Sequence, residues 1–368
     1  MKGEATMAGL AESIHAIASA SGYPDPIAFG DLAGDVISVL ASEDVLLRPR
    51  SPSGLPGGLI RIDTPYVAVV PDLHGRVALL DDLLCCPTPT LPDATFLDLL
   101  AGRELSIVCL GDILNTEGPQ GADRWRRAAR RLSAVHDMRG LLGPEMDEEM
   151  GASLRSLQLV MTLKTHLPGV FHCLKGNHDN LGNFNADGDS AFYKYAMEGA
   201  MGAEWSRLRY GEEIIMKVRR YERLLPLIAY GRRFCASHAE PAFAMSVEDL
   251  LDYSDRPDVV RALIWTGNGE ASENSVIETM KALLGPGPGE TGAWLTGHRP
   301  VAGNYSLRAC GRLVQFHNPA RRQIAWIDNR TGTAAAAMTF HELGLRGKSL
   351  SLLGTLPLVH LDQTGQGH

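Results

Sequence analysis

The stretch VVPDLHGRVALLDDLL (residues 69–84) places an aspartate and a histidine directly after a run of valines. Valine-rich runs that end at proline and glycine are typical of buried strands. Asp72 and His74 directly follow this strand. Burial of such polar side chains costs free energy unless another group binds them. The stretch therefore predicts a strand that carries ligands to a binding site.

The composition is that of a globular protein, with 368 residues of which 45% are hydrophobic and 21% charged. A formal net charge of -8 argues against nucleic acid as a partner. The six cysteines form no C-x-x-C pair and fall mostly in apolar runs, as expected for reduced thiols. The first 21 residues are too acidic and too interrupted for the apolar segment of a signal peptide, and no stretch approaches the roughly 18–20 apolar residues of a membrane span. We therefore expect a cytoplasmic protein without a membrane anchor.

Apolar residues at helical spacing predict helices over 8–20 and 28–47, and a loop rich in proline and glycine follows over 48–61. Strand patterns then recur over 66–70, 106–110, 169–174, 233–237, 293–296, 312–317 and 323–328. Their alternation with longer segments predicts an α/β fold with helices on both faces of a sheet. In such folds the ligand site lies beyond the carboxyl ends of the strands.

Five successive predicted strands are each followed by a carboxylate, amide or imidazole side chain. In chain order these are Asp72 with His74, Asp112, Asn177 with His178 and Asp179, His238, and His298. A shared metal centre explains this recurrence, and the mixture of donors suits Mn, Fe, Zn or Ni. Six candidate ligands exceed the three protein groups of a single open catalytic site. We therefore expect two divalent ions, with Asp112 as the ligand that bridges them.

The motifs D-x-H-G, G-D, G-N-H-D, a single His and G-H, in this order over residues 66–328, resemble the calcineurin-like metallophosphoesterases. The stretches LLPLIAYGRRFCASHAEPA, VRALIWTGNG and WLTGHRPVAGNY are similar in layout to the phosphoprotein-phosphatase branch of that superfamily. The resemblance implies a four-layer α/β-β/α sandwich that hydrolyses phosphate monoesters. In this family a water that bridges the two ions attacks the phosphate, and the ions neutralise the charge that develops.

The resemblance also implies a role for each site residue. Asp72 and His74 would bind the first ion, and Asp112 would bridge both ions. The ligands of the second ion would be Asn177, His238 and His298. His178 would be the general acid that protonates the leaving group.

The second motif departs from the pattern of the family. The phosphatase branch usually has G-D-x-x-D-R-G, whereas this chain has GDILNTEG over residues 111–118. Asn115, Thr116 and Glu117 therefore stand where an aspartate and a phosphate-binding arginine are expected. Asn115 or Asp179 must then orient His178, because the group bonded to one ring nitrogen fixes the tautomer of an imidazole.

Three arginines are candidates to replace the missing phosphate-binding group. Arg299 follows His298 directly, and Arg124 and Arg126 lie in a predicted helical insertion. We expect Asn115, Arg299 and Arg124 to contact the substrate. His136, His172 and His317 lack the setting of the five strand ends and are interpreted as structural histidines.

We divide the chain into N-terminal helices and a loop that pack on the core (1–60), a catalytic domain (61–345) with an inserted helical cap (about 115–168), and a C-terminal tail (346–368). The expected substrate is a phosphorylated small molecule or a phosphoprotein. Two alternatives remain open. One is a phosphodiesterase or dinucleoside-polyphosphate hydrolase, and the other is a binding module that has kept the fold and lost catalysis.

Overall fold

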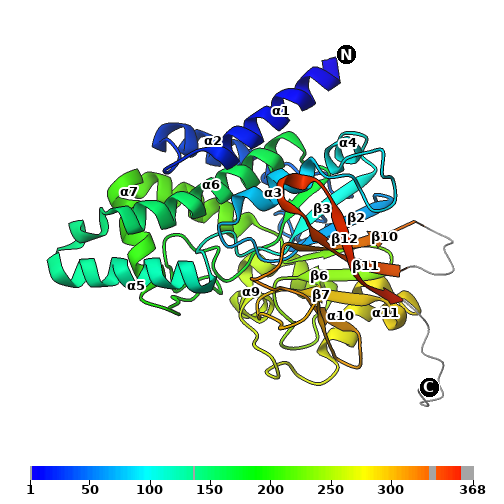
Figure 1. The fold of residues 1–368 in the computed structure, drawn as a ribbon. Coiled ribbons are helices and arrows are strands. Elements are labelled where there is room, and N and C mark those ends of the chain that lie inside the picture. Colours follow the sequence, from blue (N-terminus) through cyan, green and yellow to red (C-terminus); the bar gives the residue numbers. More distant parts are fainter. Residues whose placement is uncertain (1, 136, 331–336, 358–368) are drawn as a thin grey trace.

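Two sheets packed face to face form the centre of the molecule (Figure 1). The computed structural model describes residues 2–135, 137–330 and 337–357. Within these ranges the first sheet has the order β12-β11-β10-β2-β3-β4, and the second has the order β1-β5-β6-β7-β9-β8.

The strands that carry the candidate ligands are parallel to one another within each sheet. In the first sheet these are β2 (Tyr66–Val70), β3 (Leu105–Cys109) and β4 (Phe171–Cys173). In the second sheet β6 (Phe234–Ser237), β7 (Ala293–Thr296) and β9 (Leu313–Gln315) run parallel. Parallel strands place their carboxyl ends at one edge of a sheet, so residues far apart in sequence meet there.

The remaining strands extend the two sheets outward. In the first sheet β10 (Gln323–Asp328), β11 (Ala337–Leu343) and β12 (Leu350–Pro357) follow β2 in antiparallel pairs. In the second sheet β1 (Leu59–Arg61) and β5 (Ile228–Tyr230) extend one side and β8 (Ser306–Arg308) the other.

Helices cover the outer face of each sheet (Figure 1). Those that pack over the first sheet are α1 (Lys2–Ser19), α2 (Pro26–Ala41), α3 (Val77–Leu84), α4 (Phe96–Ala101), α6 (Pro144–His166) and α7 (Glu198–Leu224). Those on the side of the second sheet are α8 (Val247–Leu251), α9 (Pro257–Ile264), α10 (Ser275–Leu284) and α11 (Pro288–Thr291). The helix α5 (Gly118–Val135) packs beside α6, and short 3₁₀ turns lie at Met138–Leu141, Tyr253–Asp255 and Leu345–Gly347.

Three buried apolar clusters lie between successive layers of this sandwich. On β2, Val67 and Val69 point into the cluster between the sheets, while Ala68 and Val70 point into the cluster under the helices. On β7, Trp294 packs against the helices of the second sheet. Alternation of side chains along a strand supplies both faces of each sheet with apolar groups. The fold is the predicted four-layer α/β-β/α sandwich.

The structure differs from the sequence predictions at two chain segments. The helix predicted over 28–47 ends at Ala41, and the Asp44 side chain accepts a 2.7 Å hydrogen bond from the Leu46 backbone N–H in the turn that follows. Aspartate bonds of this kind compete with helix formation. Within the tail predicted over 346–368, Leu350–Pro357 form β12 because β11 offers an open edge, and residues 358–368 lie outside the described part of the chain.

The two long helices of the predicted insertion have different surroundings. Its second helix, α6, packs against α1, α2 and α3, so it is part of the layer that covers the first sheet. Its first helix, α5, lies against α6 at one side of the molecule (Figure 1). Within the described residues no helix is long and apolar enough to cross a membrane.

We expect the buried carboxyl of Glu222, on α7, to make the stability of the metal-free protein depend on pH. Glu222 is 3% exposed and accepts a 2.8 Å hydrogen bond from the Leu181 backbone N–H. Burial raises the pKa of Glu222 to about 8 from an ordinary value of 4.5. The folded state therefore holds a proton that the unfolded state has released between these two pKa values, and its contribution to stability falls as the pH rises through that interval.

Glu222→Gln keeps the acceptor for Leu181 but cannot ionise. Its free energy of unfolding, measured with urea and a chelator at pH 5, 6.5 and 8, should increase relative to that of the parent chain as the pH rises. If the free energies of unfolding of the two proteins changed by the same amount between pH 5 and pH 8, this expectation would be wrong.

Candidate metal centre

The structure brings the predicted ligands together at the carboxyl ends of the strands. Asp72 and His74 follow β2, Asp112 follows β3, and Asn177 follows β4. From the second sheet, His238 follows β6 and His298 follows β7. All six side chains are buried except that of His298, which is partly buried.

His74 is held with one ring nitrogen toward the backbone and the other toward the carboxylates. Its Nδ1 lies 2.8 Å from the Asn115 carbonyl oxygen, which can only accept, so Nδ1 donates the proton. Its Nε2 then presents a lone pair 3.5 Å from Oδ2 of Asp112. Burial lowers the pKa of His74, which keeps the ring neutral and able to bind a cation.

His238 has the same arrangement on the other side of Asp112. Its Nδ1 donates to the Leu110 carbonyl oxygen at 3.0 Å, and its Nε2 lies 2.9 Å from Oδ1 of Asn177 and 3.5 Å from Oδ2 of Asp112. Burial, with His298 as a further cause, lowers the pKa of His238 well below its usual value. A neutral ring leaves no proton between Nε2 and the amide oxygen, so two electron-pair donors face each other.

His298 completes this second group of donors. Its Nδ1 lies 2.9 Å from Oδ1 of Asn177 and 3.2 Å from Nε2 of His238. When the ring proton of His298 is on Nε2, the lone pair of Nδ1 faces those of Asn177 and His238, and a cation between them would be bound by all three. Imidazole, amide and carboxylate donors are the ligands of borderline divalent ions. The donor set therefore fits a metal ion.

The two central carboxylates need positive charge nearby. Asp72 is 0% exposed and Asp112 is 2% exposed. Burial, together with the charge of Glu117, raises the pKa of Asp72, and burial with the charge of Asp72 raises the pKa of Asp112. Two ionised carboxylates in such a site are stable only when cations compensate them. Asp72, Asp112 and His238 each offer a ligand atom within 4.8 Å of the others.

Glycines stand before three of the five ligand motifs, at positions 111, 176 and 297, and let the strand ends approach closely. A Cβ at Gly176 would overlap the backbone nitrogen and Oδ1 of Asp112, and a Cβ at Gly297 would overlap Oδ1 of Asp72. Gly111 has φ +94°, and a Cβ there would overlap the backbone of Gly176. These residues must lack a side chain for the carboxylates to reach their positions.

Four of the predicted site residues have backbone angles that are uncommon outside glycine. His74 has φ 43°, Asp112 φ 47°, Asn115 φ 62° and His298 φ 61°. Left-handed backbone in such residues costs free energy and is concentrated at functional sites. The packed sandwich beneath these loops holds them in this conformation.

His178 lies beside this cluster and is oriented by Asn115. Its Nδ1 lies 3.3 Å from Oδ1 of Asn115, and its Nε2 lies 4.0 Å from Oδ2 of Asp112. The ring also packs on Phe192, with ring centroids 4.3 Å apart. Of the two residues that the sequence offered to orient His178, Asn115 is the one whose side chain contacts the ring.

Asp179 holds the loop rather than the ring. Its carboxylate accepts hydrogen bonds from the backbone N–H groups of Asp112 at 3.0 Å, Ile113 at 2.8 Å and Gly176 at 2.8 Å. It therefore fixes the backbone that carries Asp112, and it acts as a positioning residue.

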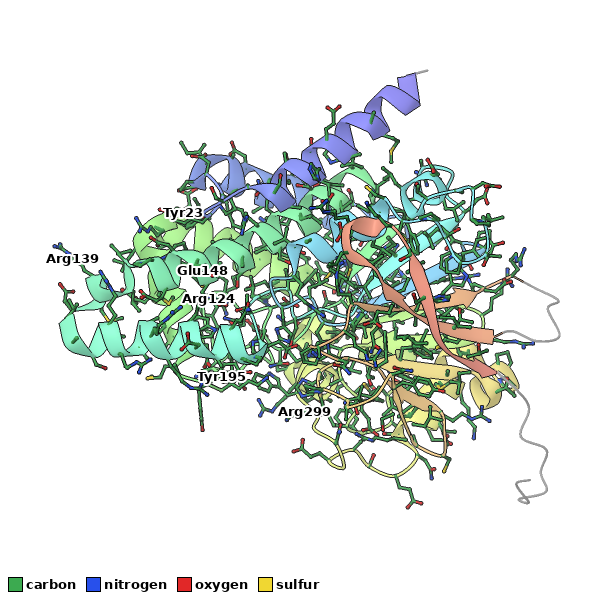
Figure 2. All side chains as sticks on the ribbon, in the orientation of Figure 1. Tyr23, Arg124, Arg139, Glu148, Tyr195 and Arg299 are labelled. Carbon is green, nitrogen blue, oxygen red and sulfur yellow. The ribbon has the colours of Figure 1, made fainter. Side chains whose placement is uncertain are left out.

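The three candidate arginines have different surroundings, and Figure 2 labels two of them, Arg124 and Arg299. The guanidinium of Arg126 lies 5.8 Å from the centroid of the Tyr195 ring. Arg124 donates to Glu148 at 2.9 Å, to Glu149 at 3.1 Å and to the Thr116 hydroxyl at 2.8 Å, so its guanidinium is already bonded. Arg299 is exposed beside the ligand His298.

Three residues near the site were missed as candidates from the sequence, namely His317, Glu117 and Lys194. His317, which follows β9, donates from Nε2 to Oε1 of Glu117 at 2.6 Å, and its Nδ1 lies 3.8 Å from Oδ2 of Asp72. Lys194 lies 3.6 Å from Glu117 and lines a small pocket with His178. The position of His317 at the end of the predicted strand 312–317 was the available signal. Of the other two histidines interpreted as structural, His172 contacts Lys164 away from the cluster, and His136 lies outside the described residues.

We expect Gly297→Ala to weaken metal binding, because the added Cβ displaces the carboxylate of Asp72. The matched control is Gly303→Ala, since a Cβ at Gly303 meets no atom within 4 Å. Bound manganese per chain, measured by atomic emission after dialysis, should fall for Gly297→Ala and stay at the parent value for Gly303→Ala. Equal metal content in a folded Gly297→Ala variant would refute the predicted role of this close approach.

Comparisons with known proteins concern the fold. No family model and no curated protein matches the sequence. A protein serine/threonine phosphatase from Saccharomyces cerevisiae, described as similar to human phosphatase PP5, superposes with a TM-score of 0.51 at 11% identity, over 93% of this chain and 92% of that chain. A mutant of a cold-active protein tyrosine phosphatase has a TM-score of 0.45 at 11% identity and covers 85% of each chain.

The cold-active protein tyrosine phosphatase of a psychrophile, Shewanella sp., has a TM-score of 0.40 at 13% identity, over 81% of this chain and 82% of that chain. The match to the serine/threonine phosphatase extends over nearly the whole of both chains. The chain therefore shares the α/β sandwich fold of this serine/threonine phosphatase, the fold that its strand-end motifs implied.

Proposed function

We propose that this protein is a metal-dependent phosphatase that hydrolyses phosphate monoesters at a centre of two divalent ions. The observation that carries the proposal is the buried set of electron-pair donors around Asp112. The lone pairs of His74, His238 and Asn177 converge there, and each ring has its proton turned outward. The fold shared with a serine/threonine phosphatase supports the same conclusion.

In this proposal Asp72 and His74 hold the first ion, and Asp112 lies between the two ions. Asn177, His238 and His298 hold the second. When bound, such a pair of ions supplies a water of lowered pKa and neutralises charge during in-line displacement at phosphorus. Mn, Fe, Zn and Ni all suit these donors.

His178 is the proposed general acid for the departing oxygen. Burial, with His74 and Lys194 as further causes, lowers the pKa of His178 well below its usual value, so the ring is neutral in the substrate-free protein. A phosphate dianion that enters beside the ring favours the protonated form, because an opposite charge within a few ångströms stabilises it. Asn115 orients the ring, and Asp179 holds the backbone of Asp112.

Lys194 and Arg299 are the proposed contacts for the substrate phosphate. Lys194 lines the same small pocket as His74, Asn115 and His178, and its side chain is 49% exposed. Arg299 is exposed next to His298. Arg124 would act on the substrate through Thr116, to which it is bonded. Both phosphorylated small molecules and phosphoproteins are substrates of this chemistry.

We expect the manganese-loaded chain to hydrolyse p-nitrophenyl phosphate, and Asp112→Asn to lose this activity because one central carboxylate loses its charge. The matched control is Asp63→Asn, since Asp63 is exposed and lies before the first residue of β2, at the end of the strand opposite to Asp72. The measurement is the release of p-nitrophenol, with bis(p-nitrophenyl) phosphate assayed in parallel. Turnover of the diester alone would favour the phosphodiesterase, and two bound ions without turnover of either ester would favour a binding module.

We also expect His178→Asn to affect substrates according to their leaving group. Loss of a general acid typically lowers the rate by about 10²- to 10⁴-fold when the leaving group needs a proton. The kcat for β-glycerophosphate should therefore fall far more than the kcat for p-nitrophenyl phosphate, whose leaving group departs as a stable anion. Asn115→Ala should give the same bias with a smaller amplitude. Equal losses on both substrates would argue that His178 binds phosphate and does not donate a proton.

A further inference from the structure

We propose that His317 is an additional protein ligand of the first metal ion, and that Glu117 holds it in the tautomer that binds metal. This inference rests on the proposed two-metal function, and it adds to the ligand set that the sequence motifs implied. It makes the first site a group of imidazole and carboxylate donors drawn from both sheets.

The hydrogen bond to Glu117 decides which nitrogen of His317 is free. His317 is 0% exposed, and its Nε2 lies 2.6 Å from Oε1 of Glu117. An ionised carboxylate can only accept, so Nε2 donates its proton to Glu117. Nδ1 is then left with a lone pair, and among the described residues it has no hydrogen-bond partner.

The free nitrogen faces Asp72, which has an unpaired oxygen of its own. Nδ1 of His317 lies 3.8 Å from Oδ2 of Asp72, and Oδ1 of Asp72 has no partner among the described residues. Leaving buried polar atoms without partners costs free energy, and the cost is larger for charged groups. A cation bound between them removes this cost for both residues.

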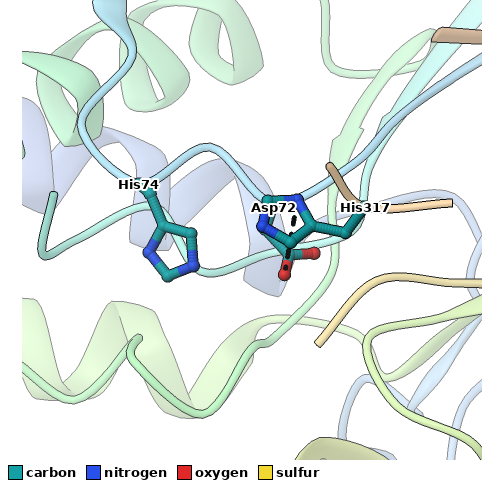
Figure 3. Close-up of side chains that lie close together, drawn as sticks. All are labelled: Asp72, His74 and His317. Carbon is teal, nitrogen blue, oxygen red and sulfur yellow. Dashed lines mark ion pairs between the residues drawn. The ribbon is translucent and has the colours of Figure 1, made fainter. Parts of the chain in front are cut away.

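His74 lies close to the same two residues. Figure 3 shows Asp72, His74 and His317 together, with the contact between His317 and Asp72 marked. The three residues each offer a ligand atom within 4.8 Å of the others. His74 follows a strand of the first sheet and His317 follows a strand of the second, and their ring centroids are 5.6 Å apart. The first ion would therefore join the two halves of the sandwich.

The altered second motif supplies Glu117. Besides its bond to His317, its Oε2 lies 3.7 Å from Nε2 of His74 and 3.6 Å from Nζ of Lys194. A carboxylate that accepts the proton of a ligating imidazole fixes the ring and strengthens it as a donor. The departure from the family motif thus replaces a phosphate-binding group with one that supports a metal ligand.

The helical insertion holds this segment in place. The preceding residue, Thr116, donates its backbone N–H to Glu149 on α6 at 2.7 Å, and its hydroxyl also contacts that carboxylate. Arg124 on α5 donates to the same Glu149 at 3.1 Å. Helices α5 and α6 therefore fix the backbone from which Glu117 reaches His317.

The test measures metal binding directly, apart from activity. We would titrate the metal-free full chain with Mn²⁺, measure bound metal by equilibrium dialysis and atomic emission, and record the electron paramagnetic resonance of the loaded protein. The variants are His317→Ala and Glu117→Gln. The control is His341→Gln, because His341 is also buried but lies on β11 and contacts Thr339.

The parent chain should bind two ions and give the exchange-coupled signal of neighbouring Mn²⁺ ions. His317→Ala should keep the second ion and bind the first ion at least tenfold more weakly. When one Mn²⁺ ion is added per site, this variant should therefore lack the exchange-coupled signal. Glu117→Gln should weaken the first site by about 10- to 100-fold, as is typical for partners of metal ligands. His341→Gln should bind as the parent chain does.

Two binding sites of unchanged affinity in His317→Ala would overturn the proposal and leave the proposed function intact. If His317→Ala fails to fold, unchanged affinities in Glu117→Gln would overturn it equally. A parent chain that binds fewer than two ions and hydrolyses no ester would instead refute the proposed function.

Discussion

The burial of Asp72 and Asp112 is the constraint on which the site depends. Two carboxylates enclosed by protein cannot both be ionised unless positive charge lies between or beside them. The nearby histidines do not supply that charge, because burial lowers the pKa of His74 and His238. Arg76 lowers the pKa of Asp72, but burial and Glu117 outweigh it and the pKa is raised. The divalent ions of the proposed centre would supply this charge.

Three histidines around the two carboxylates share one orientation of the ring. His74 donates its ring proton to the Asn115 carbonyl, and His238 donates to the Leu110 carbonyl. His317 donates to the carboxylate of Glu117. In all three rings the proton goes to an acceptor other than Asp72 and Asp112, and the other nitrogen lies within 3.8 Å of one of these two carboxylates. A cluster of structural histidines has no reason to share this orientation, whereas metal ligands require it.

The packed layers of the sandwich hold the loops of the site in this geometry. Left-handed backbone at His74, Asp112 and His298 costs free energy, and it persists because the strands before these loops are packed on both faces. Glycines at 111, 176 and 297 let the loops approach until backbone and carboxylate nearly touch. The packed layers thus bring donors from both sheets close together. The insertion holds the segment that carries Glu117, because Glu149 on α6 accepts a hydrogen bond from the Thr116 backbone N–H.

The sequence by itself determined the strands that precede the candidate ligands and the order of the motifs, and the resemblance carried by these motifs implied the four-layer fold. It could do so because alternating apolar residues mark a strand locally, and because parallel strands must end at one edge of a sheet. It also identified Asn115 as one of two residues that could orient His178.

Tertiary structure alone decided which side chains meet. His317 looks in sequence like any buried histidine, since its partner Glu117 is 200 residues away and lies on the other sheet's loop. The bonds of Arg124 to α6 and the pairing of β12 on β11 were equally invisible, because they depend on which surfaces lie side by side. Hydrogen bonds between distant segments leave no local pattern, and they set the protonation of each ligand, which is what makes the cluster a metal site.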